Sequence, residues 1–297
     1  MSVKERLIQY LNEGKKGKSQ AQVARAIGKS QAALNQWLHD KYPGDEMSIE
    51  KAVEKFLNRE RARDAQPNLL DFVMIETATS IHGAFHYCHV NGIMGIIHGP
   101  AGYGKTKAAE EYVRQTPDTI LLTAKYKWGK RPVLHSLAVE LNLSPKGQLD
   151  MVGERISSYL KGSDRLIIVD EAQFLVISGM ETLRQIHDYT KLGIVLVGMP
   201  ELYRQMLGRY KEDYEQIYSR VILNRELKRP GYDDIEALAR ANDITDNNVI
   251  DYMYLLSKKT GCLRVCMNRL QMALRYSRLY DLPLSVDLMK ETEQFML

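Results

Sequence analysis

The feature that most constrains this 297-residue chain is an eight-residue segment of the form Gly-x-x-x-x-Gly-Lys-Thr. A short apolar run typical of a buried strand, 93–97, precedes it, and an amphipathic helix is expected over about 105–114. In such a loop the glycines let backbone N–H groups converge on phosphates, and the helix N-terminus adds its positive end. The residues expected to bind ATP are Gly99, Pro100, Ala101, Gly102, Tyr103, Gly104, Lys105, Thr106 and Lys107. Among them, Lys105 is expected to reach the outer phosphates and Thr106 to bind Mg²⁺.

A second motif supports the nucleotide site. The apolar run 166–169 ends in two carboxylates, Asp170 and Glu171. At the carboxyl end of a buried strand beside the loop, Asp170 is expected to hold Mg²⁺ through water. Glu171 is expected to act as the catalytic residue that orients and deprotonates the attacking water. Together the two motifs predict an ATPase.

The surrounding pattern predicts an α/β domain with a parallel sheet, because apolar runs alternate with helical segments. The further expected strands are 119–124, 193–197 and 221–227. After Pro230 the pattern is purely helical, with helices expected over 233–242, 248–259, 263–279 and 286–296. We therefore predict a nucleotide-binding core over 67–230 and a helical lid over 231–297.

The formal charge of +4 lies entirely in the N-terminal part of the chain. Residues 1–66 contain 13 Lys and Arg against 9 Asp and Glu, whereas the rest of the chain is balanced. The polar stretch 59–66, followed by Pro67, has the character of a linker. We place a domain boundary at residue 66.

Within this basic part, residues 20–38 predict a small all-α helix-turn-helix domain that binds DNA. The first helix has an apolar inner face and ends at Gly28, which suits a tight turn, and Ser30 can cap the second helix. The outward-facing residues of the second helix are Gln31, Asn35 and Gln36. Their amides can pair with adenine edges, although a helical bundle that contacts only protein is the alternative.

Composition excludes several classes of protein. With 44% hydrophobic and 26% charged residues, the chain is neither disordered nor a disulfide scaffold. The three cysteines, Cys88, Cys262 and Cys266, are expected to be buried thiols, because no second Cys/His pair completes a zinc site. No secretory signal and no apolar run of about 20 residues is present, so we expect a cytoplasmic protein without a membrane partner.

A P-loop core followed by a short helical lid resembles the AAA+ ATPases. The resemblance implies that Arg264, in the segment 261–264, senses the γ-phosphate of its own subunit. It also implies an arginine finger that acts on a neighbouring subunit, for which Arg220 is the candidate and Arg209 and Arg225 are rivals. Family members usually carry a polar residue where this chain has Met199. Slow hydrolysis is therefore expected.

A narrower resemblance covers nearly the whole chain. The segment Asp-Lys-Tyr-x-Gly-Asp at 40–45, the P-loop region and the Asp-Glu-Ala-Gln segment at 170–173 together resemble the target-DNA activators of Mu-type transposable phages. The resemblance implies an ATP-dependent protein that binds double-stranded DNA largely without sequence preference. It implies assembly as a helical homo-oligomeric filament on target DNA and recruitment and stimulation of a DDE-type transposase. Hydrolysis, stimulated by DNA and transposase, would then clear the protein from DNA near the element's own ends.

The core must then contribute DNA contacts despite its balanced charge. The segment 125–131 contains four basic residues among two aromatic ones and is expected to form the loop after the second strand. Its candidate DNA-binding residues are Lys125, Lys127, Lys130 and Arg131. Lys146 is a further candidate in the next loop, and the lid residues Arg269, Arg275 and Arg278 form an alternative patch.

Two other classes of function remain open from sequence. A helicase loader or transposase-helper ATPase shares the same core but acts on other partners. A nucleotide-switched transcription regulator would also combine a helix-turn-helix with a nucleotide site. The regulator should select a defined DNA site, the loader should require a replicative helicase, and the target activator should coat arbitrary duplex DNA only with ATP.

Overall fold

The computed structural model describes residues 1–12, 18–207 and 211–292. The chain divides into two compact units, one formed by Leu69–Leu270 and the other by Met1–Asn68 with the chain from Gln271 onward. Each unit is described by itself. The predicted domain limits of 1–66, 67–230 and 231–297 remain predictions.

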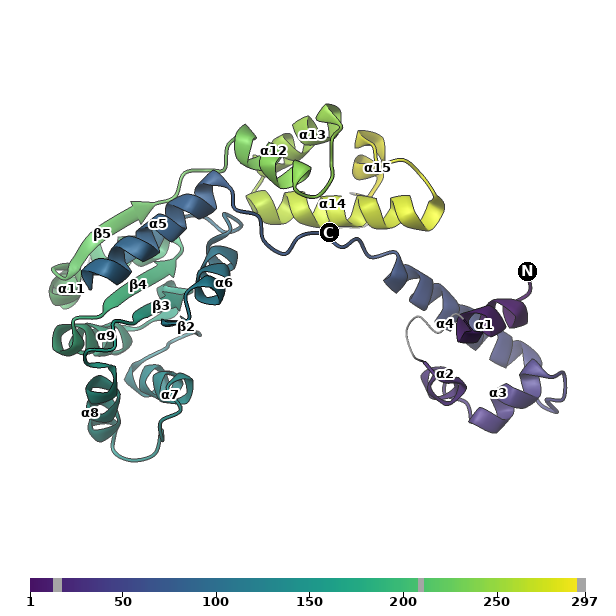
Figure 1. Ribbon diagram of the computed structural model, residues 1–297, viewed down its shortest axis with the longest axis horizontal. Helices are drawn as coiled ribbons and strands as arrows, with labels where there is room; N and C mark the ends of the chain where they lie inside the picture. Colours follow the sequence, from purple (N-terminus) through teal and green to yellow (C-terminus); the bar gives the residue numbers. More distant parts are fainter. Residues whose placement is uncertain (13–17, 208–210, 293–297) are drawn as a thin grey trace. The chain divides into compact units, whose positions relative to one another are not determined.

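A five-stranded parallel sheet in the order β2-β3-β4-β1-β5 forms the centre of the larger unit (Figure 1). The strands are β1 (Met94–His98), β2 (Thr119–Thr123), β3 (Leu166–Asp170), β4 (Gly193–Gly198) and β5 (Val221–Glu226). The predicted α/β parallel-sheet class is confirmed. Because all strands are parallel, their carboxyl ends lie at one edge, where the P-loop and the two carboxylates follow β1 and β3.

Helices cover both faces of this sheet, and alternate strand residues supply the two cores. Ile97 of β1 packs into the core beneath α5 and α6, whereas its neighbour Ile96 packs into the opposite core. The first layer consists of α5 (Glu76–Asn91) and α6 (Lys105–Gln115). The second contains α7 (Lys130–Glu140), α8 (Leu149–Leu160), α9 (Ile177–Thr190), α10 (Pro200–Leu207) and α11 (Lys211–Tyr218).

The chain after β5 is helical, as predicted. Its elements are α12 (Tyr232–Arg240), α13 (Asn247–Ser257), α14 (Cys262–Tyr280) and α15 (Val286–Glu291). The end predicted for the last helix, at residue 296, lies outside the described residues. Within the larger unit, Asp234 of α12 accepts a 2.8 Å hydrogen bond from the Thr77 hydroxyl, which joins this helix to α5.

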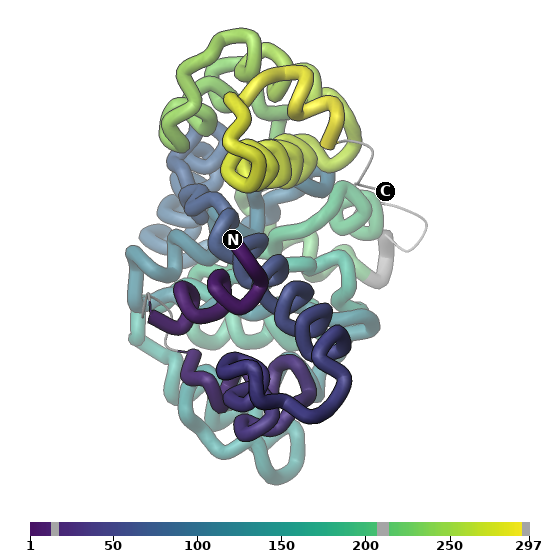
Figure 2. The backbone as a smooth tube through the Cα atoms, turned by 90° about the vertical axis from the view of Figure 1, so that its right-hand side faces the viewer, coloured from purple at the N-terminus to yellow at the C-terminus, as the bar shows by residue number. Residues whose placement is uncertain are grey.

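The N-terminal residues form the predicted helix-turn-helix. Its helices are α1 (Val3–Asn12), α2 (Gln20–Ala26), α3 (Gln31–Leu38) and α4 (Glu46–Asp64), and α1 contacts α4 (Figure 2). Gly28 has a left-handed φ of +71° in the turn, and the Ser30 hydroxyl accepts a 3.1 Å bond from the Ala33 N–H at the start of α3. Leu34 and Trp37 are buried, as the sequence pattern indicates.

The linker expected over 59–66 is wrong for most of that stretch, because α4 continues to Asp64. The physical reason is that Glu60 is buried at 5% exposure and is held by charged and polar neighbours. Its carboxylate pairs with Lys18 at 2.8 Å and Arg63 at 2.6 Å and accepts a 2.9 Å bond from the Tyr10 hydroxyl. The charged stretch therefore belongs to the packing of this domain.

Candidate nucleotide site

The P-loop follows β1 at the carboxyl edge of the sheet and turns through two left-handed glycines. Gly102 and Gly104 have φ values of +83° and +82°, which residues with a side chain rarely adopt. The Lys105 ammonium lies inside the loop, where its Nζ donates bonds of 2.6 and 2.8 Å to the carbonyls of Gly99 and Pro100. Burial lowers the pKa of Lys105, while the carboxylates that follow β3 oppose the shift. A half-buried ammonium in a loop of this shape suits a phosphate ligand.

The hydroxyl of Thr106 and the carboxylate of Asp170 meet across the site. Thr106 Oγ1 donates a 2.7 Å hydrogen bond to Asp170 Oδ2, and the Glu171 N–H donates to Oδ1 at 2.8 Å. Asp170 is only 2% exposed, and burial raises its pKa. Mg²⁺ prefers oxygen ligands and usually binds through one or two protein groups plus substrate phosphates. This pair fits such an ion, and the described residues contain no cluster of three or more His, Cys, Asp or Glu for another metal.

Glu171 adopts a left-handed backbone conformation, with φ of +53°, directly after β3. The side-chain amide of Gln173 donates a hydrogen bond to Glu171 Oε2 and accepts a 3.0 Å bond from the Met199 N–H. Sequence reasoning assigned no role to Gln173, although it lies within the Asp-Glu-Ala-Gln segment. The two bonds join residues that follow two neighbouring strands, β3 and β4.

The start of α14 lies directly against the P-loop. The Leu263 N–H donates a 3.1 Å bond to the Gly102 carbonyl. The next residue, Arg264, adds to the lowering of the Lys105 pKa, so its positive charge lies within electrostatic reach of the loop. A second arginine, Arg229, was missed from sequence; it donates to the Tyr103 hydroxyl at 3.4 Å and to the Lys258 carbonyl at 2.7 Å. The sequence feature that could have indicated Arg229 is a basic residue soon after the last strand of the sheet.

Two predicted site residues are engaged elsewhere. Lys107 forms ion pairs with Asp71 at 2.8 Å and Glu110 at 3.1 Å, so its predicted contact with nucleotide competes with these partners. Arg220 forms an ion pair with Asp188 at 2.9 Å and precedes β5 at the amino edge of the sheet. That edge is opposite to the P-loop of the same chain. A finger role for Arg220, as predicted, would therefore require the nucleotide of another subunit.

Of the two alternative candidates for the arginine finger, the structure describes only Arg225. Arg225 lies within β5 and is exposed. Arg209 lies outside the described residues. All three arginines remain candidates for a contact in trans.

Comparison with known proteins assigns the chain to a family. Three family models match separate parts of the chain: a helix-turn-helix over residues 8–50, an AAA domain over 90–206 and the C-terminal part of the Mu B transposition protein over 219–290. The Mu-like prophage FluMu DNA transposition protein B of Haemophilus influenzae is 30% identical over 275 residues, which cover 89% of this chain and 94% of that protein. The chain belongs to the Mu-like transposition protein B family.

Other members and solved structures agree with the assignment of family and fold. The ATP-dependent target DNA activator B of Escherichia phage D108 is 27% identical over 258 residues, covering 85% of this chain and 82% of the relative. Among solved structures, Aeropyrum pernix ORC2 gives a TM-score of 0.58 at 15% identity, covering 77% of this chain and 69% of ORC2. Domain III of Thermotoga maritima DnaA gives 0.52 at 16% identity, covering 76% and 94%. These structures show that the chain has the AAA+ fold.

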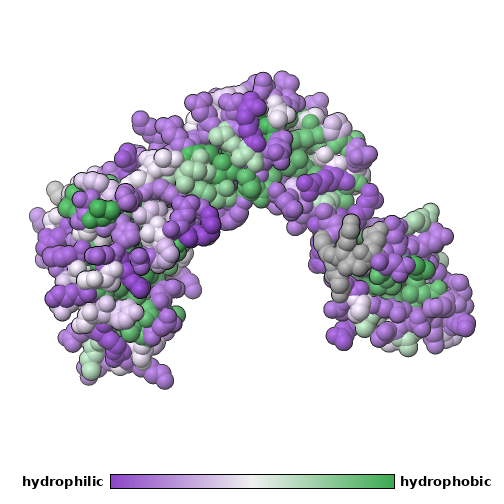
Figure 3. Space-filling model, in the orientation of Figure 1, coloured by the Kyte–Doolittle hydropathy of each residue, from purple (hydrophilic) through white to green (hydrophobic). Residues whose placement is uncertain are grey.

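The basic segment 125–131 of this family member is arranged differently from the expected loop. Lys130 and Arg131 begin α7, and Lys130 forms an ion pair with Asp150 at 2.6 Å. Trp128 is 7% exposed and packs in the core, so Tyr126, at 77% exposure, is the aromatic available for contact. The exposed basic residues are Lys125, Lys127 and Arg131, together with Lys146 between α7 and α8. Hydrophilic residues cover most of the visible face of the larger unit (Figure 3).

The alternative DNA-binding patch predicted on α14 was wrong to include Arg269, because this side chain is only 6% exposed and packs between helices. Arg278 is exposed and donates a 2.9 Å bond to the Gln66 carbonyl, while Arg275 is half-buried. On α3, the predicted DNA-facing residues Gln31, Asn35 and Gln36 are all exposed. Asn35 also accepts a 3.3 Å bond from the Gln20 amide of α2.

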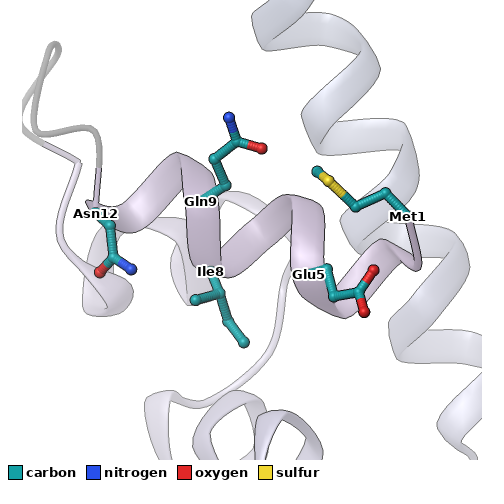
Figure 4. Close-up of a pocket in the computed structure, with 5 residues that line it drawn as sticks. All are labelled: Met1, Glu5, Ile8, Gln9 and Asn12. Atoms are coloured by element: carbon teal, nitrogen blue, oxygen red, sulfur yellow. The ribbon is translucent and has the colours of Figure 1, made fainter.

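A hollow beside α1 is a further surface feature of the N-terminal domain (Figure 4). Its lining residues are Met1, Glu5, Ile8, Gln9 and Asn12. Glu5 is the one ionisable side chain among them, so the hollow offers no set of groups for phosphate or metal. The three cysteines are buried free thiols, and burial raises the pKa of Cys88 and Cys266 to about 12. Within the described ranges, no helix has the length and apolar character needed to cross a bilayer.

Proposed function

We propose that this chain is an ATP-dependent, largely sequence-nonspecific DNA-binding ATPase that assembles as a helical filament on target DNA. In this proposal it recruits and stimulates a DDE-type transposase and directs the choice of target. The observation that most supports this proposal is the 2.7 Å hydrogen bond between Thr106 and Asp170 at the P-loop, in a member of the transposition protein B family. A relative from Escherichia phage D108 carries the name ATP-dependent target DNA activator B, which supports the same activity here.

The site residues have distinct proposed roles. Lys105 binds the outer phosphates in place of its bonds to the Gly99 and Pro100 carbonyls. Thr106 and Asp170 hold Mg²⁺, which when bound neutralises charge on the phosphates. Glu171 accepts the proton of the attacking water. The remaining loop residues cradle the phosphates through their backbone N–H groups.

Two arginines complete the proposed mechanism. Arg264 at the start of the lid senses the γ-phosphate of its own subunit, consistent with its electrostatic reach to Lys105. Arg220 acts in trans on the nucleotide of a neighbouring subunit and exchanges its ion pair with Asp188 for that contact. ATP bound between subunits thereby becomes a requirement for assembly.

Assembly explains how a core with balanced charge can hold DNA. The exposed residues Lys125, Lys127 and Lys146 supply a few phosphate contacts in each subunit, and Tyr126 adds an exposed ring. Each contact is weak alone, but linked subunits sum them into stable binding. The helix-turn-helix domain contributes further DNA contact through α3.

Electron microscopy of the full chain on random-sequence duplex DNA, with and without ATP, tests the proposal. Continuous filaments on arbitrary DNA should form only with ATP, and Lys105→Ala should abolish both nucleotide binding and filaments. Complexes at one defined site would instead indicate a regulator. DNA coating that Lys105→Ala leaves intact would contradict the filament model.

A further inference from the structure

Gln173 lies in a short 3-10 turn (Ala172–Phe174) directly after β3, and its side-chain amide is bonded at both ends. The amide NH2 donates to the Glu171 carboxylate, and the amide oxygen accepts a 3.0 Å bond from the Met199 N–H. The amide therefore connects the end of β3 to the end of β4. These strands are direct neighbours in the sheet.

The orientation of this amide follows from its partners. A main-chain N–H can only donate, so the oxygen of Gln173 must face Met199, and the NH2 group is left to face Glu171. Glycine at position 198 provides the space for it. A Cβ at Gly198 would lie 2.6 Å from the Gln173 oxygen, closer than such atoms approach.

The end of β4 is also joined to the P-loop, because the Gly99 N–H donates a 3.2 Å bond to the Gly198 carbonyl. Met199, which follows Gly198, has no side-chain group that can donate a hydrogen bond to the Glu171 carboxylate. Glu171 is itself a long side chain on a left-handed residue, with φ of +53°. Without a partner its carboxylate would sample several rotamers.

We propose that Gln173 is a positioning residue for ATP hydrolysis, which holds the Glu171 carboxylate in place and supplies the polar link that Met199 cannot. The inference rests on the proposed role of Glu171 as the base. Fixing one carboxylate geometry raises the fraction of molecules in which the attacking water is correctly aligned, since misplacement by about 1 Å can cost about 100-fold in rate.

The test compares Gln173→Leu with the parent chain in DNA-stimulated ATP hydrolysis and in nucleotide affinity. The expected result is a kcat lower by about 10- to 100-fold, with the nucleotide Kd within about twofold. Gln205→Leu is the matched control, because Gln205 is exposed and borders the same hollow as Gln173. It should leave both quantities unchanged. An unchanged kcat in Gln173→Leu, or an equal loss of nucleotide affinity, would overturn the positioning role.

A second variant moves the amide without deleting it. Gly198→Ala places a Cβ against the Gln173 oxygen and should lower kcat in the same way, again with nucleotide affinity retained. Adding Gln173→Leu to Gly198→Ala, or to Glu171→Gln, should cause no further loss, because all three changes act through one carboxylate. Additive losses would overturn the proposal.

The two proposals fail differently. If Glu171→Gln hydrolyses ATP at the parent rate, both the role of Glu171 and that of Gln173 are overturned. If Glu171→Gln is inactive while Gln173→Leu is fully active, only the positioning role falls and the proposed function stands.

Discussion

The main-chain N–H of Leu263 donates a 3.1 Å hydrogen bond to the carbonyl of Gly102, so the first turn of α14 is attached to the P-loop itself. The approach is close, since a Cβ at Gly102 would lie 1.9 Å from the carbonyl oxygen of Gly261. The loop that is proposed to bind phosphate therefore cannot change shape without moving the start of the lid. This contact also brings Arg264 to the site.

Gly102→Ala should reduce both stability and nucleotide affinity, because it combines backbone strain with a collision against the lid. Gly162→Ala is the matched control: Gly162 has a similar φ of +73° but nothing within 4 Å of its Cβ position. The control should lose about 1–2 kcal/mol of unfolding free energy from strain alone. Urea unfolding and titration with a fluorescent ATP analogue measure the two effects. Equal losses in the two variants would show that the lid contact is unimportant.

Asp170→Asn should stabilise the nucleotide-free protein at pH 7 while it prevents hydrolysis. Burial raises the pKa of Asp170 above its ordinary value of 3.8, so the folded state binds the proton more tightly than the unfolded state. Its favourable contribution is complete below that ordinary value and is lost as pH rises through the folded pKa. The melting temperature of the variant should be higher by about 2–4 °C at pH 7. The difference should shrink as the pH is lowered toward 4.

Asp188→Asn provides a control of opposite sign for that experiment. The Arg220 guanidinium holds the pKa of Asp188 below its ordinary value, so its carboxylate stabilises the fold above that value. This contribution is lost as the pH falls through the folded pKa. Asp188→Asn should therefore lower the melting temperature at pH 7. Shifts of the same sign in the two variants would contradict the electrostatic assignment.

Glu171→Gln should retain ATP-dependent assembly on DNA but stall its release, because the amide cannot accept the proton of the attacking water. The expected loss in hydrolysis is about 100-fold or more. Phosphate release and the lifetime of DNA complexes after removal of free ATP measure the two steps. Glu140→Gln, at the exposed end of α7, should behave like the parent chain. Rapid turnover in Glu171→Gln would exclude Glu171 as the base.

Replacing Lys125 and Lys127 together by glutamine should weaken ATP-dependent DNA binding and flatten its dependence on salt, because fewer counterions are released. The matched pair is Lys161 and Lys191, which are exposed and precede β3 and β4 at the opposite edge of the sheet. Each pair contains one residue with a left-handed backbone, Lys127 or Lys191, so backbone effects cancel. The slope of log affinity against log salt should change only in the first pair. An equal slope in the two double variants would show that the DNA contacts lie elsewhere on the protein.

Local motifs explain why much of the fold and site was predictable. The P-loop, the strand that ends in Asp170 and the turn at Gly28 each depend on a few consecutive residues whose backbone needs are specific. The linker over 59–66 failed because Glu60 has partners far away along the chain, namely Tyr10 of α1 and Lys18, which precedes α2. The sequence around Trp128 likewise indicates a basic, aromatic loop, but the Trp128 side chain packs in the core.

The sequence by itself determined the order of the modules, the family resemblance and the residues proposed to surround a phosphate. These properties follow from the spacing of residues within short motifs and from the alternation of apolar strands with helical segments along the chain. Only the tertiary structure decided that Gln173 joins Glu171 to Met199 and that Leu263 bonds to Gly102. Partners so distant along the chain are chosen by strand order, register and packing, which no single segment encodes.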